Sequence, residues 1–335
     1  MQPAIYGLEG ERLGAGERAF FRDADPAGYI LFKRNCSDRD QLAALTDELR
    51  SVHGRANLPI LIDQEGGRVA RMKPPEWPAF PAADRFAALY RTAPMSAIEA
   101  ARANAQAIAA LLVEVGINVD CLPLLDVRQP GANDIIGDRA LGEEPMQVAA
   151  LGRAVIDGLR AGGVVGVVKH IPGHGRSLAD SHLELPVVRA SEEELEVDLE
   201  PFRSLRDAPM GMTSHLLYSV WDGERPASQS PRVIGDIIRD RIGFDGFLMT
   251  DDLGMKALSG DFGERAVLAI GAGCDAALHC SGIMSEMVAV ANALGEMSEA
   301  SSERLERAMA TIAGRVDGLS YEELADKRDR LLAYA

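Results

Sequence analysis

Short apolar segments recur along the whole chain, and each is rich in branched side chains. Their apolar residues run together and do not alternate strictly with polar ones, which is typical of a β-strand covered on both faces. Strands of this kind predominate in parallel sheets, so the pattern predicts a buried parallel sheet. The segments are residues 4–8, 28–32, 58–63, 117–123, 164–170, 210–216, 244–252 and 274–280.

Helical patterns occupy several of the intervals between these segments. Residues 37–52 begin with Ser37, a residue suited to the N-cap position, and carry leucines at helical spacing. Residues 96–116 are rich in alanine and end at Gly116, which suits the position just after a helix. The alternation of strand and helix favours a sheet whose strands are parallel. Two further helical patterns cover residues 144–163 and 191–208.

The count of eight predicted strands favours a TIM-like (β/α)₈ barrel, a fold that typically occupies about 250 residues. An open doubly wound sheet is the alternative. No GxGxxG motif follows the first predicted strand, however, which weakens the dinucleotide-binding form of that alternative. No linker rich in Pro, Ser or Gly divides the chain. We therefore expect a single α/β domain over residues 1–335, completed by two helices that begin near residue 300.

Acidic residues dominate the charge of the chain. It has 51 Asp and Glu against 35 Lys and Arg, a formal net charge of −16. Such a field repels nucleic acids and anionic lipids, so we expect neither as a partner. The N-terminal residues are too acidic for a signal peptide, and the apolar segments are far shorter than the ~20 residues of a membrane span. Because the four cysteines lack metal-type and redox-type spacing, we expect free thiols and a cytoplasmic location. We also expect a monomer.

Charged or imidazole side chains follow five consecutive predicted strands. In a (β/α)₈ barrel these positions face one end, where active sites lie. A single polar residue there often caps a helix, but buried charges cost several kcal/mol each unless they are paired, so capping does not explain five. Their mixed charge suits a ligand with many hydroxyl and amide groups, such as a sugar. They are Asp63 with Arg71, Asp138 with Arg139, Lys169 with His170, His215, and Asp251 with Asp252.

Three of the six histidines lie in one irregular segment, residues 169–186. A metal site, a catalytic loop and a solvated hairpin are all compatible with this pattern. Pro172 and Gly173 separate His170 from His174, which excludes the helical His-x-x-x-His face that binds zinc. We therefore expect no metal and no cofactor. We interpret the segment as a catalytic loop in which His174 has a shaping role.

Four motifs, taken in order, carry a resemblance to a known family: DQEGGRV (63–69), IGDRALG (136–142), KHIPGHG with ADSH (169–182), and TDDLGM (250–255). They resemble the motifs of glycoside hydrolase family 3. More narrowly, the chain resembles the single-domain bacterial β-N-acetylhexosaminidases of peptidoglycan recycling. KHIPGHG with a downstream Asp-Ser-His is the specific part, and each other motif alone would be weak. The resemblance implies a TIM-like barrel, in agreement with the strand count.

The resemblance also implies a retaining, two-step mechanism through a covalent glycosyl-enzyme. The position of the nucleophile matches Asp251, and Asp252 beside it is the competing choice. In this branch of the family a histidine serves as the acid/base and is oriented by an aspartate two residues earlier. Those positions are His182 and Asp180 here. An unperturbed imidazole titrates near ~6.5, within the range that proton transfer at neutral pH requires.

Sugar binding is assigned by the same resemblance to side chains at the strand ends. Asp63 is expected to accept hydrogen bonds from two ring hydroxyls, and Lys169 and Arg139 can donate to hydroxyls or to an acetamido oxygen. Glu65 and Arg68 are expected to position their own loop. The implied substrate is a small carbohydrate, a muropeptide with a non-reducing terminal N-acetylglucosamine that the enzyme removes by exo cleavage. The implied contacts are Asp63, Arg71, Arg139, Lys169 and His170.

The sequence leaves three other functions open. A histidine acid would not repel an incoming phosphate as a carboxylate would, so an N-acetylglucosaminide phosphorylase is one variant. A β-glucosidase or β-xylosidase of the same broad family is another, although such enzymes usually have an additional domain that supplies the acid/base carboxylate. A non-catalytic sugar-binding protein is the third, and the joint presence of Asp251, Asp180 and His182 argues against it.

Overall fold

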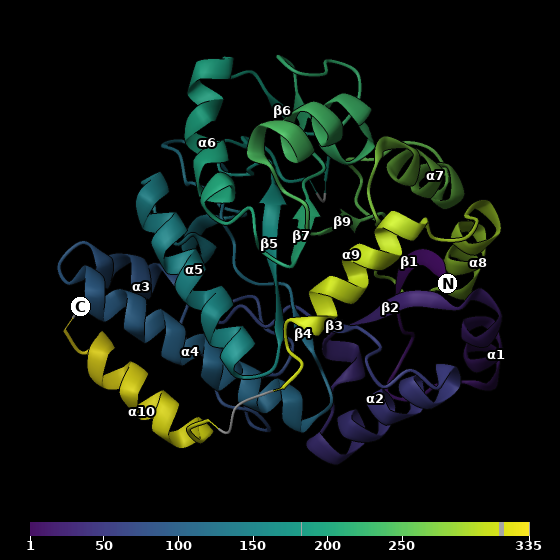
Figure 1. Ribbon diagram of the computed structural model, residues 1–335, viewed down its shortest axis with the longest axis horizontal. Coiled ribbons are helices and arrows are strands. Elements are labelled where there is room, and N and C mark those ends of the chain that lie inside the picture. The colour runs from purple at the N-terminus through teal and green to yellow at the C-terminus, as the bar shows by residue number, and fades with distance from the viewer. Residues whose placement is uncertain (182, 315–317, 335) are drawn as a thin grey trace.

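A closed barrel of parallel strands forms the centre of the computed structural model (Figure 1), which describes residues 1–181, 183–314 and 318–334. Within these ranges its eight strands are β1 (Gln2–Gly7), β2 (Pro26–Leu31), β3 (Ile60–Ile62), β4 (Val119–Asp120), β5 (Val165–Ile171), β7 (Met210–Thr213), β9 (Phe247–Asp252) and β10 (Ala276–His279). They follow one another around the barrel in chain order, and β10 pairs with β1 to close it. Each strand overlaps one predicted apolar segment, which confirms the TIM-like (β/α)₈ fold class.

Helices cover the outside of the barrel (Figure 1). Among the helices in the described ranges, none combines the length and the apolar character that crossing a bilayer would require. The helices are α1 (Ala15–Ala24), α2 (Arg39–His53), α3 (Ala83–Tyr90), α4 (Pro94–Glu114), α5 (Pro145–Ala161), α6 (Glu192–Ser204), the π-helix η4 (Val233–Ile242), α7 (Phe262–Ala272), α8 (Met284–Ala293), α9 (Glu299–Ala310) and α10 (Tyr321–Leu332).

The four helices predicted between the strands correspond to α2, α4, α5 and α6. The predicted N-cap of α2 is wrong by one residue. The Asp38 carboxylate caps this helix by accepting a hydrogen bond from Gln41 N at 2.8 Å, whereas the Ser37 hydroxyl contacts the side chain of Gln41. Both residue types suit an N-cap, so their adjacency made the choice ambiguous. Gly116 follows the C-cap of α4 in a left-handed conformation, with φ of 76°, as predicted.

The apolar core has two parts, one inside the barrel and one between the barrel and its helices. Inward side chains such as Ile30, Leu61 and Met249 fill the barrel interior. Leu305 and Met309 of α9 join this inner core, and α9 lies across the front of the barrel in Figure 1. The helix therefore closes one end of the barrel with apolar side chains.

Polar contacts identify the end of the barrel that α9 covers. Asp275, which directly precedes β10, accepts Arg304 Nη1 and the Ser301 hydroxyl of α9 on the same oxygen, at 3.1 and 2.7 Å. Its other oxygen accepts Arg239 Nη2 at 2.8 Å. The covered end is thus the N-terminal end of the strands, and the C-terminal end is left for the polar residues that follow each strand.

A second, two-stranded parallel sheet pairs β6 (Val187–Val188) with β8 (Leu217–Tyr218). It joins the segment after β5 to the segment after β7, on the side of the molecule where the strands end. This sheet was not predicted from the sequence.

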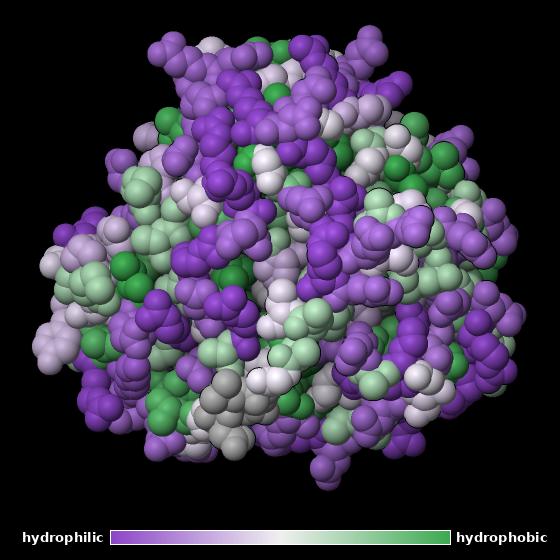
Figure 2. Space-filling model, viewed as in Figure 1, coloured by the Kyte–Doolittle hydropathy of each residue, from purple (hydrophilic) through white to green (hydrophobic). Residues whose placement is uncertain are grey.

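Figure 2 shows that polar and charged side chains cover most of the face viewed in Figure 1. Apolar side chains gather near α7, where Val267 and Leu268 are about half exposed. The predominance of polar groups agrees with the net charge of −16.

Candidate active site

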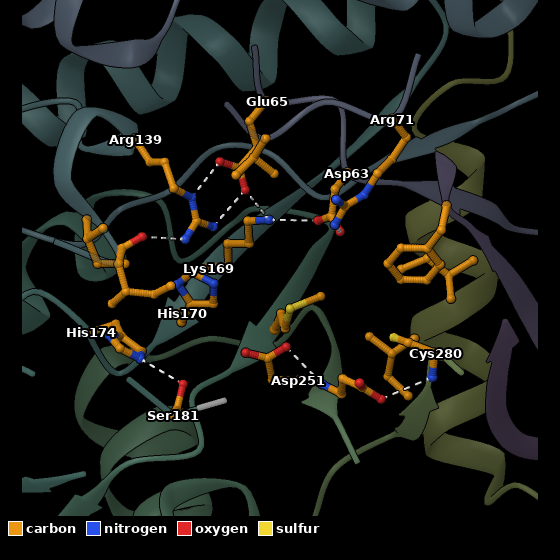
Figure 3. A pocket seen from close by; sticks show the side chains of 18 of the residues that line it. Asp63, Glu65, Arg71, Arg139, Lys169, His170, His174, Ser181, Asp251 and Cys280 are labelled. Carbon is orange, nitrogen blue, oxygen red and sulfur yellow. Dashed lines mark hydrogen bonds and ion pairs between the residues drawn. The ribbon is translucent and has the colours of Figure 1, made fainter. Parts of the chain in front are cut away.

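A cavity of about 400 Å³ opens at the C-terminal end of the barrel (Figure 3). Apolar side chains, among them Phe32, Met212 and Leu278, form part of its wall. The predicted nucleophile and all five predicted sugar-binding residues line it as well. The barrel therefore brings together side chains that are up to 188 residues apart in the sequence, from position 63 to position 251. These residues are Asp63, Arg71, Arg139, Lys169, His170 and Asp251.

Lys169 is the centre of a charge network in the cavity wall. Its ammonium group lies 2.9 Å from Asp63 Oδ1 and 2.7 Å from Glu65 Oε1, and its side chain is only 2% exposed. Arg71 Nη2 donates to Asp63 Oδ2 at 2.8 Å. Burial alone would raise the pKa of Asp63, but Lys169 and Arg71 outweigh it and hold the pKa well below its usual value. Asp63 is therefore a fixed, ionised acceptor.

Glu65 has more contacts than its predicted role in positioning its own loop requires. Arg139 Nε and Nη2 donate to its two oxygens, both at 2.8 Å, in a bidentate pair. Because Glu65 also contacts Lys169 of β5, it connects the loops that follow β3 and β4 to that strand. Arg68, predicted to position its own loop, also contacts a neighbouring loop, since its Nη2 donates to the carbonyls of Asp134 and Ile135 at 2.6 and 2.8 Å.

The two adjacent aspartates at the end of β9 have different environments. Asp252 Oδ1 accepts hydrogen bonds from the backbone N–H groups of Gly254 and Cys280, each at 3.0 Å, so Asp252 fixes the turn after the strand. Asp251 Oδ1 accepts from Asp252 N at 2.8 Å, and its carboxylate faces the cavity in Figure 3. Burial would raise the pKa of Asp251, but His170 and His215 outweigh it and lower the pKa. Its carboxylate is ionised and available to a ligand.

His215, the residue predicted at the end of the sixth strand, supports the backbone beside Asp251. Its Nε2 lies 3.0 Å from the carbonyl oxygen of Asp252, and its Nδ1 lies 2.7 Å from the Ser228 hydroxyl. Since a carbonyl only accepts, Nε2 carries the proton and Nδ1 accepts from the hydroxyl. Burial lowers the pKa of His215, so the imidazole is neutral and holds the backbone of Asp252 in place through its hydrogen bond.

Asp126 is a site residue to which the sequence assigned no role. It is fully buried, and its Oδ2 accepts His170 Nδ1 at 2.7 Å. Its Oδ1 accepts the backbone N–H groups of His170 at 3.2 Å and His174 at 2.6 Å. Burial would raise the pKa of Asp126, but His170 and His174 outweigh it and lower the pKa to about 2. The only sequence signal was its place after an apolar run, because its partners lie 44 and 48 residues away.

The predicted acid/base, His182, lies outside the described residues. Its predicted partner Asp180 is described, and the Asp180 carbonyl accepts hydrogen bonds from the backbone N–H groups of Leu183 and Glu184, at 2.9 and 3.2 Å. Ser181, between the two, lines the cavity. Gly175 brings the start of this segment so close to Val127 that a Cβ there would stand 1.9 Å from the Val127 carbonyl oxygen.

In the described ranges, no three His, Cys, Asp or Glu side chains converge in a way that could hold a metal ion. The polar groups of the wall instead pair acid with base, and Lys169 with Asp63 and Glu65 is the clearest example. Such paired groups retain free lone pairs and N–H bonds for a ligand with many hydroxyls.

Comparison with known proteins agrees with this geometry. Residues 11–314 match the "Glycosyl hydrolase family 3 N terminal domain". A protein of Methylococcus capsulatus named "Beta-hexosaminidase" is 40% identical over 282 residues, 83% of this chain and 82% of that protein. The crystal structure of NagZ from Neisseria gonorrhoeae in complex with N-trifluoroacetyl-D-glucosamine superposes with a TM-score of 0.87 at 29% identity, over 100% of this chain and 98% of that one. A family 3 β-N-acetylglucosaminidase from Paenibacillus has the same TM-score at 31% identity; 98% of this chain is covered, and it spans 66% of that longer chain.

Proposed function

The chain belongs to glycoside hydrolase family 3 and is a glycoside hydrolase, and on that premise we propose that it is a retaining exo-β-N-acetylglucosaminidase acting on muropeptides. The observation that carries the proposal is the Asp251 carboxylate, which is half-buried, ionised and faces a cavity suited to one sugar ring. The N-acylglucosamine bound to the Neisseria protein supports the choice of sugar. A cytoplasmic location is part of the proposal, and the four free thiols support it.

The first step forms a glycosyl-enzyme. An Asp251 oxygen attacks C1 of the sugar while the bond between C1 and the leaving oxygen breaks, and the protonated imidazole of His182 gives its proton to that oxygen. Asp180, two residues earlier in the chain, favours the charged imidazole and orients its ring. The positive charge that develops on the sugar is offset by the Asp251 carboxylate.

The second step releases the sugar. Water attacks C1 from the face that the first leaving group occupied, and the now neutral His182 takes one of its protons. The bond between C1 and Asp251 breaks, which restores the carboxylate and gives a product with the original anomeric configuration. After the second step the enzyme is back in the protonation state in which it began the first, so the cycle is balanced.

The charge network provides the proposed grip on the sugar. Asp63 is held from two sides by Lys169 and Arg71, so its remaining lone pairs are already oriented toward the ring hydroxyls. Arg139 is held by Glu65, and His170 by Asp126. Groups fixed in this way need no rearrangement when the substrate distorts toward the transition state, which is what makes electrostatic stabilisation effective.

The test of the nucleophile uses p-nitrophenyl β-N-acetylglucosaminide. Asp251→Ala should lower kcat on the order of 10⁴-fold or more, as removal of a catalytic nucleophile does elsewhere. Asp157→Asn, which changes a half-buried carboxylate of α5 that pairs with Arg160, is the matched control and should keep full activity. Inactivation with a 5-fluoro-N-acetylglucosaminyl fluoride should leave the label on Asp251. A label on Asp252, or an active Asp251→Ala variant, would contradict the assignment.

The natural substrate and the acceptor need a second experiment. A disaccharide-peptide with terminal N-acetylglucosamine, incubated with enzyme in phosphate and in phosphate-free buffer, should yield free N-acetylglucosamine in both. Mass spectrometry of the products distinguishes this from N-acetylglucosamine 1-phosphate, whose formation would make the enzyme a phosphorylase. Faster cleavage of an aryl β-glucoside than of the matching β-N-acetylglucosaminide would instead make it a β-glucosidase.

A further inference from the structure

His174 is a buried imidazole of the cavity wall to which the proposed reaction gives no part. Its side chain is 4% exposed, and its backbone N–H donates to the fully buried Asp126 at 2.6 Å. Its ring stands edge-on to the ring of His170, with centroids 5.5 Å apart. These contacts fix both its backbone and its ring plane, so His174 is a rigid point within the KHIPGHG segment.

From this fixed point the imidazole reaches the loop that carries the proposed acid/base. His174 Nε2 lies 3.4 Å from the hydroxyl of Ser181, a long hydrogen bond that Figure 3 marks with a dashed line. Ser181 is 2% exposed, and its carbonyl accepts a hydrogen bond from Ala257 N at 3.2 Å. Ala257 belongs to the segment that follows Asp251. Ser181 therefore joins the KHIPGHG segment to the segment behind the nucleophile.

The residues on either side of Ser181 are Asp180 and His182, the proposed proton-transfer pair. We propose that His174 is a positioning residue for this pair, and that it acts through the Ser181 hydroxyl. The inference rests on the proposed function, because it presumes that residues 180 and 182 transfer protons. The inference adds His174 as a residue that positions the proton-transfer pair and does not itself transfer a proton.

Other contacts show that the start of the loop is held independently of His174. Tyr218 donates from its hydroxyl to the Gly173 carbonyl at 2.6 Å, and Arg176 Nε donates to Asp198 of α6 at 2.5 Å. Loss of the His174 side chain should therefore leave the loop attached at its base. What changes is the position of Asp180 and Ser181, where the hydroxyl contact is lost.

The protonation of His174 agrees with a positioning role. Burial, together with the neighbouring His170, lowers the pKa of His174 to about 4. The ring is neutral at the pH at which a glycosidase with a histidine acid would work, so it has no proton to give to a leaving group. It can nevertheless keep its hydrogen bond to Ser181 across that range.

The kinetic test compares substrates with good and poor leaving groups. A good leaving group, such as 2,4-dinitrophenol, departs with little protonation, whereas a sugar or methylumbelliferone needs the acid. His174→Leu and Ser181→Ala should each lower kcat/KM for the poor leaving group by roughly 10–100-fold, as misplacement of a catalytic group by about 1 Å does. Neither variant should change kcat/KM by more than about threefold for the good leaving group. His174→Gln, which keeps a polar group near the position of Nε2, should recover part of the loss.

A double-mutant cycle tests whether the two residues act through their contact. The variant with both His174→Leu and Ser181→Ala should be about as slow as either single variant, because the contact is lost only once. Leu178→Ala, which alters a side chain of the same loop that is 73% exposed, is the control and should match the wild type. Losses that multiply in the double variant, or that are equal for both leaving groups, would overturn the proposal.

Hydrogen exchange supplies a readout that does not depend on activity. In His174→Leu and in Ser181→Ala, a peptide covering residues 177–186 should exchange faster than in the wild type, while peptides from α4 and α5 should be unchanged. Unchanged exchange in that peptide would refute the positioning role even if no substrate is turned over. If these variants exchange faster but the wild type has no glycosidase activity, the contact between His174 and Ser181 is supported and the proposed function is wrong.

Discussion

At the residue scale, the chemistry of the cavity depends on which charges are already paired. Asp63, Glu65, Lys169 and Arg139 form a continuous chain of ion pairs. Buried pairs of this kind contribute little net stability relative to apolar residues, but removal of one partner leaves a buried charge unmatched. The site is therefore more sensitive to the loss of a single charge than its small size implies.

Glu65→Gln tests this sensitivity. The substitution keeps the shape of the side chain but leaves Lys169 and Arg139 with one carboxylate fewer, so we expect a loss of about 3–5 kcal/mol in the free energy of unfolding. Urea denaturation followed by circular dichroism measures it. Asp157→Asn, which breaks the surface pair with Arg160, in which the two side chains are 31% and 60% exposed, should cost less than about 1 kcal/mol. Equal losses in the two variants would show that the network is not a coupled unit.

Sequence reasoning succeeded for residues at strand ends and failed for residues whose role depends on a distant partner. Asp63, Lys169 and Asp251 were found because a barrel directs every strand end toward one place. Asp126 was missed because its function comes from the imidazole of His170 at the end of β5 and the backbone of His174 beyond it. No local pattern records such a contact. Glu65 was found, but its pairing with the loop after β4 and with β5 was not.

At the element scale, the apolar periodicity located all eight barrel strands and the helices with the most regular patterns. It did not locate β6 and β8, which lie in the segments after β5 and β7. It also placed the start of α2 one residue early, because Ser37 and Asp38 are both favourable caps. Boundaries depend on single hydrogen bonds, which explains why they are harder to predict than the elements themselves.

The α2 boundary makes a stability prediction. Asp38→Ala should lower the free energy of unfolding by about 1 kcal/mol, because it removes the acceptor for Gln41 N in the first turn. Ser37→Ala should have a smaller effect, since the Ser37 hydroxyl contacts only a side chain. Urea midpoints of the two variants, compared at equal m-values, decide between them. A larger loss for Ser37→Ala would mean that the cap lies where the sequence first placed it.

At the scale of the whole molecule, buried ionisable groups determine how stability depends on pH. The folded pKa of His174, about 4, is below the ~6.5 of an unfolded chain, so the unfolded state binds the proton first as the pH falls. The stability that His174 contributes is therefore complete above about pH 6.5 and is lost toward pH 4. Asp126, with a folded pKa of about 2, adds a loss of the same sign below pH 4.

Urea unfolding at pH 7, 6, 5 and 4 tests the sign. The free energy of unfolding should decrease toward acid by up to a few kcal/mol, at ~1.4 kcal/mol for each unit of pKa difference. His174→Gln should flatten this dependence between pH 6.5 and 4, whatever its effect at pH 7. A variant slope equal to that of the wild type would show that His174 titrates normally in the folded protein.

Asp198 provides a control of the opposite sign. Burial raises its pKa to about 6 despite the ion pair with Arg176. Between the unfolded pKa, about 4, and pH 6, the folded state holds the proton more tightly, so this group makes stability fall as the pH rises. Asp198→Asn should therefore make the pH dependence steeper in the same interval in which His174→Gln makes it flatter.

The position of α9 across the N-terminal end of the barrel has a consequence for how ligands enter and leave. Because apolar side chains fill the barrel interior, the cavity that Lys169 and Asp63 line is closed at its base, and this apolar base forms its floor. Under the proposed function, a pocket with this floor admits the terminal residue of a glycan and not the middle of its chain. In the proposed two-step reaction the aglycone would leave first, water would enter after it, and the sugar bound next to the floor would leave last.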